Sequence, residues 1–524
     1  MVVRISDLPI VRTKQRQLGE PSHQERSTQR LGEPHHQEHS VQHGVHHHNA
    51  AMLAIVDAMG RSMKNQPSSA TTDHQQGVRD GRAGCAMLIR GARVIDPASS
   101  TDKLLDIAIE DGVIAAIGEK LPVNPAARVV DGEGLIACPG LIDPHVHLRE
   151  PAPQPAETIA GGAEAAVAGG FTSVVCMPNT SPPIDTPARV RWVVERASTT
   201  ARCRVFPTAA ATLGRAGQRV TDMRGLASAG AVAFTDDGDC VASAQVMQQV
   251  LLSAKDASRS FMQHAQEATL TQGASMHEGA ASTRLGLVGW PREAEEIIVE
   301  RDITLNCAIG AHYHVQHVSS AGTVEILRRA QTDSQMAGLV TGEASPHHLT
   351  LTHDACDGYN TLAKMNPPVR EERDRQALRQ AVADGVITVL ATDHAPHTAD
   401  SKQASFAEAS FGILGLETAL SLYVEALVET SALDWSGLIE RMTVNPAALC
   451  NLDALNLGRL AAGGPADVTI IDPTCQWIFD MSAIAGSATN SPFAGRCLRT
   501  RAVATIVAGR LALDRLQQER VVTR

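Results

Sequence analysis

Aromatic residues are scarce in this chain, since Phe, Trp and Tyr make up only 3% of its 524 residues. The core must therefore consist mainly of Ala, Val, Leu and Ile, and the hydrophobic content of 43% is that of an ordinary globular protein. An excess of basic residues is also lacking, because the formal net charge is −11. This charge argues against a protein that binds nucleic acid through a basic face.

Long apolar runs and paired cysteines are lacking as well. No run is long enough for a membrane span, and residues 1–17 lack the uninterrupted apolar stretch of a signal peptide. The ten cysteines are scattered without a CxxC pair, a pattern typical of reduced thiols. These features predict a cytoplasmic protein.

The segment 1–86 differs in composition from the rest of the chain. The run QLGEPSHQE (17–25) recurs as RLGEPHHQE (30–38), and the whole segment is polar and rich in Gln, His and Ser. Such a segment cannot bury enough apolar surface to fold alone. We therefore predict a disordered low-complexity extension, with a weak metal-scavenging tail as the functional alternative.

Two β-rich segments bracket the centre of the chain, at 87–140 and 455–515. Both contain short β-branched runs broken by Gly, Asp and Pro, which favours strands of a small antiparallel sheet. We predict that the two segments together form one small β-sandwich domain, followed by a tail at 516–524.

The centre, 141–454, alternates strand-like apolar runs with Ala- and Leu-rich helical stretches. Eight runs are apolar almost throughout, as expected of strands that are buried on both faces. Eight strand–helix units predict a parallel (β/α)8 barrel of the TIM type, and hence an α/β fold. The runs lie at 141–147, 171–179, 204–212, 231–237, 260–267, 312–320, 336–348 and 385–396.

The first of these runs ends in the stretch DPHVHLREP (143–151). Side chains two residues apart point to the same face of a strand, so His145 and His147 should project together. Two imidazoles on one face pack poorly but provide half of a metal site. The alternative is a strand end whose histidines bond to backbone carbonyls.

Polar residues that can bind metal follow several other strand-like runs. In a barrel the carboxyl ends of the strands converge, so these residues should meet at one point. Imidazole and carboxylate ligands suit zinc and similar divalent ions. Asp236 and Asp237 have a second interpretation, because Asp-Asp-Gly is ordinary turn chemistry. The other candidates are His264, His312, His314, His317, Asp393, His394 and His397.

Taken together, the motifs resemble those of the class I dihydroorotases, in the amidohydrolase superfamily. The resemblance covers roughly residues 87–514 and follows the family's order. It rests on the motifs DPHVHLREP (143–151), MPNTSPPID (177–185), AFTDDG (233–238), HVQHVSS (314–320), SPHHLTLT (345–352), KMNPPVR (364–370), ATDHAPH (391–397) and GLETAL (415–420).

The resemblance implies an enzyme that holds one or two zinc ions and interconverts N-carbamoyl-L-aspartate and L-dihydroorotate in de novo pyrimidine (UMP) biosynthesis. It implies that Asp393 both binds metal and carries the proton. Arg149, Asn179 and His397 resemble the residues that hold the substrate carboxylate, and Asn366 a residue that contacts the ring. The implied metal ligands are His145, His147, Asp237, His264, His317 and Asp393.

Two features depart from the family pattern. The AVAFTDDG run (231–238) has no lysine to bridge two metals, so Asp237 must serve if two ions bind. Ser410 stands where a proline is expected, which suggests a more flexible substrate loop.

The alternatives to a dihydroorotase are a related cyclic amidohydrolase (a hydantoinase or allantoinase) and an inactive scaffold for aspartate carbamoyltransferase. The resemblance also implies a homodimer and allows association of an active enzyme with that transferase.

Overall fold

The computed structural model describes residues 86–153 and 156–516. The predictions for the N-terminal extension and for nearly all of the C-terminal tail lie outside the described residues. None of the described helices is long and apolar enough to cross a membrane.

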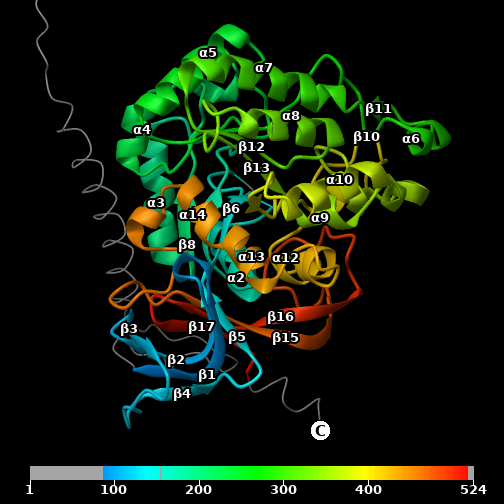
Figure 1. Ribbon diagram of the computed structural model, residues 1–524. Helices are drawn as coiled ribbons and strands as arrows, with labels where there is room; N and C mark the ends of the chain where they lie inside the picture. The colour runs from blue at the N-terminus through cyan, green and yellow to red at the C-terminus, as the bar shows by residue number, and fades with distance from the viewer. Residues whose placement is uncertain (1–85, 154–155, 517–524) are drawn as a thin grey trace, which may run out of the picture. The chain divides into compact units, whose positions relative to one another are not determined.

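The two flanking segments form one eight-stranded sheet (Figure 1). Its strand order is β17-β16-β15-β5-β1-β2-β3, with β4 paired to β1. The antiparallel pairing of β15 with β5 joins the strands of the two segments into one sheet. The strands are β1 (Met87–Asp96), β2 (Thr101–Glu110), β3 (Val113–Gly118), β4 (Arg128–Asp131), β5 (Ile136–Pro139), β15 (Val468–Ile478), β16 (Cys497–Val507) and β17 (Arg510–Asp514).

The prediction of an antiparallel sheet is wrong in part, because this sheet is mixed. Strand β1 pairs in parallel with both β4 and β5, and antiparallel with β2. A single long strand can serve three partners because its first half bonds to β4 and its second half to β5. The pairing of β1 with β2 shifts register between Ile89 and Ala92, where Gly91 has a φ of +66°. Runs of β-branched residues predict strands but not their direction.

The central segment alternates strands and helices as predicted, and its strands pair in parallel. They form a three-stranded sheet, β6-β7-β8, and a four-stranded sheet, β14-β13-β12-β9. The strands are β6 (Leu141–Val146), β7 (Phe171–Cys176), β8 (Arg204–Pro207), β9 (Phe261–Gln263), β12 (Tyr313–Val315), β13 (Val340–Ala344) and β14 (Val389–Leu390). A separate short pair is formed by β10 (Met276–His277) and β11 (Gly289–Trp290).

The predicted fourth strand, 231–237, makes single bridges in place of a regular strand. Phe234 bridges Ala209 after β8 on one side and Phe261 of β9 on the other. A further bridge joins Val146 of β6 to His394 after β14. The two sheets are thus linked by backbone hydrogen bonds at both of their edges.

Many of the helices that alternate with the strands begin at a side-chain cap. Thr158 caps α2 by accepting a bond from Gly161 N, and Ser320 caps α8 by accepting one from Thr323 N. The α-helices are α2 (Ile159–Gly169), α3 (Pro187–Thr200), α4 (Met223–Ala229), α5 (Ala244–Asp256), α6 (Ala280–Leu285), α7 (Glu293–Ile309), α8 (Ala321–Thr332), α9 (Pro346–Thr350), α10 (Glu372–Ala383), α11 (Ala399–Gln403), α12 (Ala419–Tyr423), α13 (Trp435–Met442) and α14 (Val444–Leu449). The short helices η3 (His353–Tyr359) and η4 (Thr361–Ala363) lie between α9 and α10.

One buried cluster draws side chains from strands of both central sheets. It includes Ile142 of β6, Val175 of β7, Phe206 of β8, Met262 of β9 and Val389 of β14. Residues of α14 join the same cluster, and this helix contacts β6 and β14. The strands therefore converge on a common apolar interior, which fixes where their carboxyl ends point.

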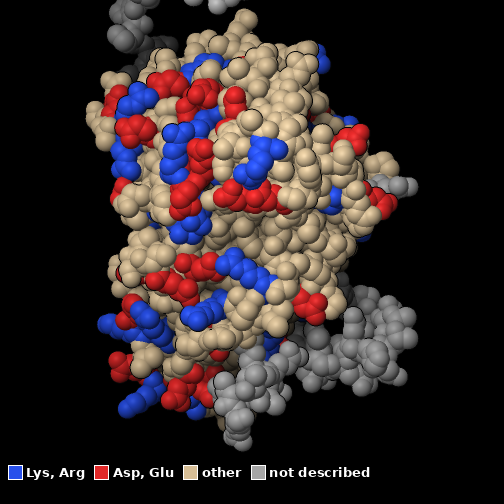
Figure 2. All heavy atoms as spheres, turned by 90° about the vertical axis from the view of Figure 1, so that its right-hand side faces the viewer, with Lys and Arg blue, Asp and Glu red and all other residues tan. Residues whose placement is uncertain are grey.

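Charged side chains of both signs are mixed on the face drawn in Figure 2. Asp and Glu lie beside Lys and Arg there, without a broad patch of one sign. A face of this kind is not the basic surface that nucleic-acid binding uses.

Candidate metal centre

The first two histidines of the site come from the end of β6. Both are buried, with His145 0% and His147 5% exposed. Asp143 Oδ1 accepts hydrogen bonds from the backbone N of His145 and of Thr392, each 3.1 Å long. The aspartate of the DPHVH motif therefore fastens the end of β6 to the segment that carries Asp393.

Asp236 and Asp237 have different roles. Asp236 Oδ1 accepts a 3.0 Å bond from Thr212 N, and its other oxygen accepts from the Thr212 hydroxyl. Asp237 lies among the histidines, with Oδ1 3.5 Å from His145 Nε2 and Oδ2 3.5 Å from His147 Nε2. Only Asp237 therefore enters the cluster, and Asp236 holds the turn.

The remaining histidines follow β9 and β12. His264 Nδ1 lies 2.8 Å from His317 Nε2 and 3.4 Å from Asp237 Oδ1. His317 Nε2 lies 3.6 Å from the same Asp237 oxygen. Two strands on the far side of Asp237 thus supply a second pair of imidazoles.

Asp393 completes the cluster from the segment after β14. Its Oδ1 lies 3.0 Å from His147 Nε2 and 3.5 Å from His145 Nε2. Asp393 and His317 have φ values of 47° and 32°, and Arg149 has 57°. Non-glycine residues rarely adopt this left-handed conformation, and such strain is typical of functional sites.

All six predicted ligands meet in one buried cluster. Three groups of three residues each place their ligand atoms within 4.8 Å of one another. Asp237 belongs to two of the groups, His145–His147–Asp237 and Asp237–His264–His317, and the third is His145–His317–Asp393. Among the described residues, His145 Nε2 and Asp393 Oδ2 are buried without a hydrogen-bond partner. Buried ligand atoms without a hydrogen-bond partner fit a divalent cation.

Three of the histidines have an oxygen acceptor at the ring nitrogen that faces away from the cluster. His145 Nδ1 lies 2.5 Å from Glu343 Oε1, and His147 Nδ1 lies 3.0 Å from Asn179 Oδ1. His264 Nε2 lies 3.0 Å from Gln266 Oε1. An oxygen acceptor places the proton on the outer nitrogen and leaves the lone pair on the inner one. Metal-ligating histidines are usually held in this way.

The carboxylates of the cluster are held in their charged form. Burial alone would raise the pKa of Asp237, but His145, His264 and His317 bring it well below its usual value. The pKa of Asp393 is likewise lowered by His145 and His147 against the effect of burial. Two ionised carboxylates among four imidazoles form a site that favours a cation.

The four predicted substrate residues border this cluster and are partly exposed. Arg149 lies 3.3 Å from His397, measured between Nη2 and Nε2, and its Nε donates to Pro396 O at 3.2 Å. Asn179 contacts His147, and Asn366 Nδ2 donates to Gln266 Oε1 at 3.2 Å. Among the described residues, no carboxylate lies within ion-pair distance of the Arg149 guanidinium, which is therefore available to an anionic ligand.

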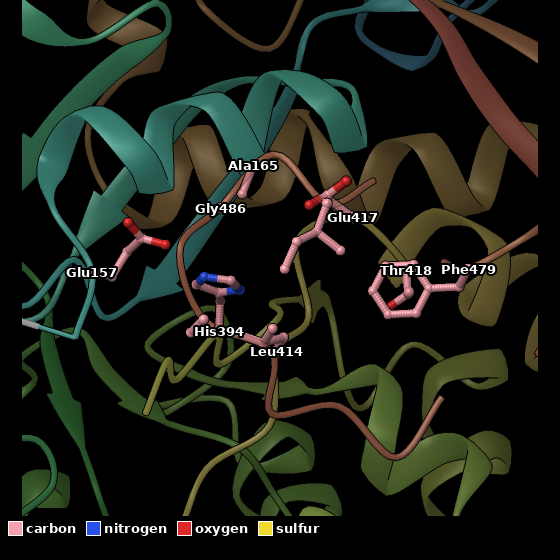
Figure 3. A pocket seen from close by; sticks show the side chains of 10 residues that line it. Glu157, Ala165, His394, Leu414, Glu417, Thr418, Phe479 and Gly486 are labelled. Carbon is pink, nitrogen blue, oxygen red and sulfur yellow. The ribbon is translucent and has the colours of Figure 1, made fainter. Parts of the chain in front are cut away.

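Three other histidines that the sequence analysis considered lie outside the cluster. His312 Nδ1 contacts Ser260 Oγ at 2.9 Å, and His314 Nε2 contacts Glu343 Oε2 at 3.1 Å. His394 Nδ1 accepts bonds from Gly415 N and Leu416 N, and its ring borders a small cavity shared with Glu157 and Glu417 (Figure 3). These rings therefore support the strand ends that carry the ligands.

A fourth His–His–Glu group lies apart from the cluster, formed by His277, His353 and Glu371. It makes a poor cation site, because both ring nitrogens of His277 face guanidinium groups. Arg292 lies 3.3 Å from its Nε2, and Arg370 lies 3.4 Å from its Nδ1. The guanidinium groups of Arg292 and Arg370 therefore occupy the positions beside His277 that a metal ion would need.

Sequence reasoning missed Glu343 and Gln266, which position three of the ligands. Glu343 is 1% exposed and also accepts a 3.1 Å bond from His317 N. Its pKa is lowered to about 2, because His145 and His314 outweigh the effect of burial. An acidic residue within the apolar run 336–348 needs a partner, and this signal could have identified it. Gln266 offers no such signal.

Comparison with known proteins identifies the family. The family model described as "Dihydro-orotase-like" matches residues 134–323. The dihydroorotase of Pelobacter propionicus is 44% identical over 430 residues, which cover 82% of this chain and 100% of that protein. The dihydroorotase of Trichlorobacter lovleyi is 44% identical over 428 residues, covering 82% and 99%. The chain belongs to the dihydroorotase family.

Solved structures show that this dihydroorotase family member shares its fold with hydantoinases. An L-hydantoinase (dihydropyrimidinase) from Arthrobacter aurescens has a TM-score of 0.73 at 24% identity, and covers 82% of this chain and 96% of its own. A dihydropyrimidinase from Brevibacillus agri has a TM-score of 0.72 at 22% identity, covering 82% and 95%. The family implies a metal, and the cluster of six His and Asp side chains is where this chain can bind one.

Proposed function

We propose that the chain is a zinc-dependent dihydroorotase that interconverts N-carbamoyl-L-aspartate and L-dihydroorotate. The observation that carries this proposal is the Arg149 guanidinium, which has no carboxylate partner among the described residues and lies next to the buried ligand cluster. A cyclic amide that bears a carboxylate would fit both, with its carboxylate at Arg149 and its amide at the ligand cluster. Hydantoin and allantoin carry no carboxylate for this arginine. The relatives named dihydroorotase support the same activity.

We propose His145, His147, Asp237, His264, His317 and Asp393 as the metal ligands. Imidazole nitrogens and carboxylate oxygens in this combination favour zinc. Because Asp237 belongs to two of the three groups, it is the residue that would be shared if two ions bind. The segment 231–237 contains no lysine that could take this role.

In the proposed reaction a bound metal would polarise the ring amide carbonyl and make water nucleophilic near neutral pH. Arg149, Asn179 and His397 would hold the substrate carboxylate, and Asn366 would contact the ring. Asp393 would accept the proton of the attacking water at its unpartnered Oδ2 and deliver it to the ring nitrogen that leaves. Synthesis of dihydroorotate reverses these steps.

We also propose that the central segment forms an eight-stranded (β/α)8 barrel. The bridges of Phe234 to Ala209 and Phe261, and of Val146 to His394, support a ring of eight strands. We propose 141–454 as the barrel and 87–140 with 455–515 as the small β domain. The buried apolar cluster that five strands share with α14 supports the same arrangement.

The test of the proposed function is an assay of purified protein, loaded with zinc, on L-dihydroorotate. Loss of its ultraviolet absorbance is followed, with hydantoin and allantoin as parallel substrates. We expect hydrolysis of dihydroorotate alone, abolished by a chelator and restored by zinc. Hydrolysis of hydantoin or allantoin in place of dihydroorotate would favour the related amidases. No hydrolysis by folded, metal-loaded protein would favour the inactive scaffold.

We propose that the assembly is a homodimer acting on a small-molecule substrate in the cytoplasm. The family resemblance also allows association with aspartate carbamoyltransferase. Sedimentation velocity of the protein alone, and then mixed with that transferase, tests both proposals. A single species at the mass of one chain would contradict the dimer.

Glu343 should control the affinity for metal. We expect Glu343→Gln to weaken zinc binding by about 10- to 100-fold, because the charged acceptor that orients His145 is lost. Metal retention is measured by competition with a chromophoric chelator. Asp302→Asn is the matched control, because Asp302 is also a buried acid but bonds to Tyr313 and Gln263 outside the cluster. Equal zinc affinity in Glu343→Gln and wild type would contradict the role of Glu343.

A further inference from the structure

A buried lysine, Lys402, lies beside the substrate-binding residues and has no role in the proposed chemistry. It belongs to α11 and is 4% exposed. Its Nζ donates to Thr361 O at 2.9 Å, Lys364 O at 3.2 Å and Ser410 O at 2.8 Å. An ammonium group has three protons, so this set of acceptors is complete. Lysine is almost never fully buried without partners, and here backbone carbonyls satisfy its hydrogen bonds.

The three carbonyls belong to two separate segments. Thr361 is the first residue of η4 and Lys364 follows its last, whereas Ser410 belongs to the loop 404–412. The neighbouring Ser401 accepts a 3.1 Å bond from Ser410 N, so α11 holds Ser410 by both its N–H and its carbonyl. A proline at position 410 could not donate this bond. The serine therefore adds a tie to this loop, in contrast to the flexibility expected from its departure from the family pattern.

Further contacts fasten the same loop to the segment after η4. Gly412 N donates to Lys364 O at 3.0 Å, and Lys364 Nζ donates to Ala407 O at 2.9 Å. The Lys364 ammonium also lies 4.3 Å from the centre of the Phe411 ring. Lys402 is the only one of these groups that bonds to both segments from a third element, α11.

The two segments carry or support two proposed substrate residues. Gly412 packs directly under His397, since a Cβ on it would lie 2.6 Å from His397 Cδ2. Asn366 follows Lys364 by two residues and reaches Gln266. A shift between the loop and the segment after η4 would therefore move His397 and Asn366 relative to each other.

We infer that Lys402 is a positioning residue, which locks the loop 404–412 against the segment 361–366 so that His397 and Asn366 face the substrate together. This inference rests on the proposed dihydroorotase activity. Its consequence is that loss of the Lys402 ammonium weakens substrate binding more than it slows the chemical step, because the metal cluster and Asp393 have no contact with Nζ.

The test compares Lys402→Met with wild type in two measurements. The first is KM and kcat for L-dihydroorotate in zinc-loaded protein. We expect KM to rise at least about tenfold, since the loop and the segment after η4 lose the ammonium that bonds to both, with kcat and zinc content nearly unchanged. The second is limited digestion with chymotrypsin, in which cleavage after Phe406 and Phe411 should become faster. A merely structural role would instead lower the active fraction, and so kcat, at unchanged KM.

Two further variants keep the test decisive. Lys402→Gln retains two donor protons and should give an intermediate KM, which also serves if the methionine variant does not fold. Lys255→Met is the control, because Lys255 is an exposed lysine whose Nζ also donates to a backbone carbonyl, that of Ile309, far along the chain from the loop. KM and loop cleavage equal to wild type in both Lys402 variants would overturn the inference, as would equal changes in the control.

The two proposals fail in different ways. Wild-type protein that does not hydrolyse dihydroorotate would contradict the proposed function, and the digestion would then decide the inference alone. Faster cleavage of the loop in the Lys402 variants only would support it, and unchanged cleavage would overturn it.

Discussion

Asp393→Asn should lower kcat for dihydroorotate hydrolysis by about 10³- to 10⁴-fold, in the range that general acid–base groups contribute. An amide at this position has the same shape but cannot take the proton of the attacking water. The carboxylate can take this proton at Oδ2, which is buried without a partner among the described residues. Reaction in the direction of synthesis should fall by the same factor.

Zinc content must be measured in the same preparation, because Asp393 is also a proposed ligand. A loss of activity that follows the loss of zinc would show ligation alone, whereas a loss with zinc retained shows proton transfer. Asp236→Asn is the matched control, since Asp236 is a buried acid that bonds to Thr212 outside the cluster. We expect less than a tenfold change there. A zinc-loaded Asp393→Asn enzyme with kcat within tenfold of wild type would contradict the assignment.

Arg149→Met should lower kcat/KM for dihydroorotate by about 10²- to 10³-fold, equivalent to roughly 3–4 kcal/mol. The guanidinium can hold a carboxylate through two parallel hydrogen bonds, and methionine removes both the charge and the donors. Dihydrouracil, which lacks the carboxylate of dihydroorotate, provides the sharper measurement. We expect wild type to hydrolyse dihydrouracil slowly, and Arg149→Met to leave that rate nearly unchanged, so the preference for dihydroorotate over dihydrouracil should collapse.

Two variants bound this prediction. Arg149→Lys keeps the charge without the planar fork and should fall between wild type and Arg149→Met. Arg202→Met removes a partly exposed arginine paired with Glu164 and should change kcat/KM less than twofold. If Arg149→Met lowered the rates for dihydroorotate and dihydrouracil equally, the arginine would act on the site's structure and not on the substrate carboxylate.

Much of the site could be predicted from the sequence because its ligands obey local rules. The spacing of His145 and His147 places them on one face of a strand, and the alternation of strands and helices brings strand ends to one edge. The resemblance then named His317 in preference to His312 and His314. The structure shows that the latter two rings face Ser260, Thr341 and Glu343 instead.

The sequence by itself determined the alternation of strands and helices in the centre and the residue types at the strand ends, since these depend on periodicities of a few residues. It did not show that the run 231–237 makes only single bridges. Only the tertiary structure decided the partners of those residues. Glu343 lies 198 positions from His145 in the sequence. Asp236 and Asp237 are neighbours in the sequence, but the first bonds to Thr212 and the second lies among the histidines. The parallel pairing of β1 with β4 and β5 and the bonds of Lys402 to Thr361 O and Lys364 O likewise join segments that are distant in the sequence. Such contacts depend on how the whole chain packs, so no pattern of neighbouring residues predicts them.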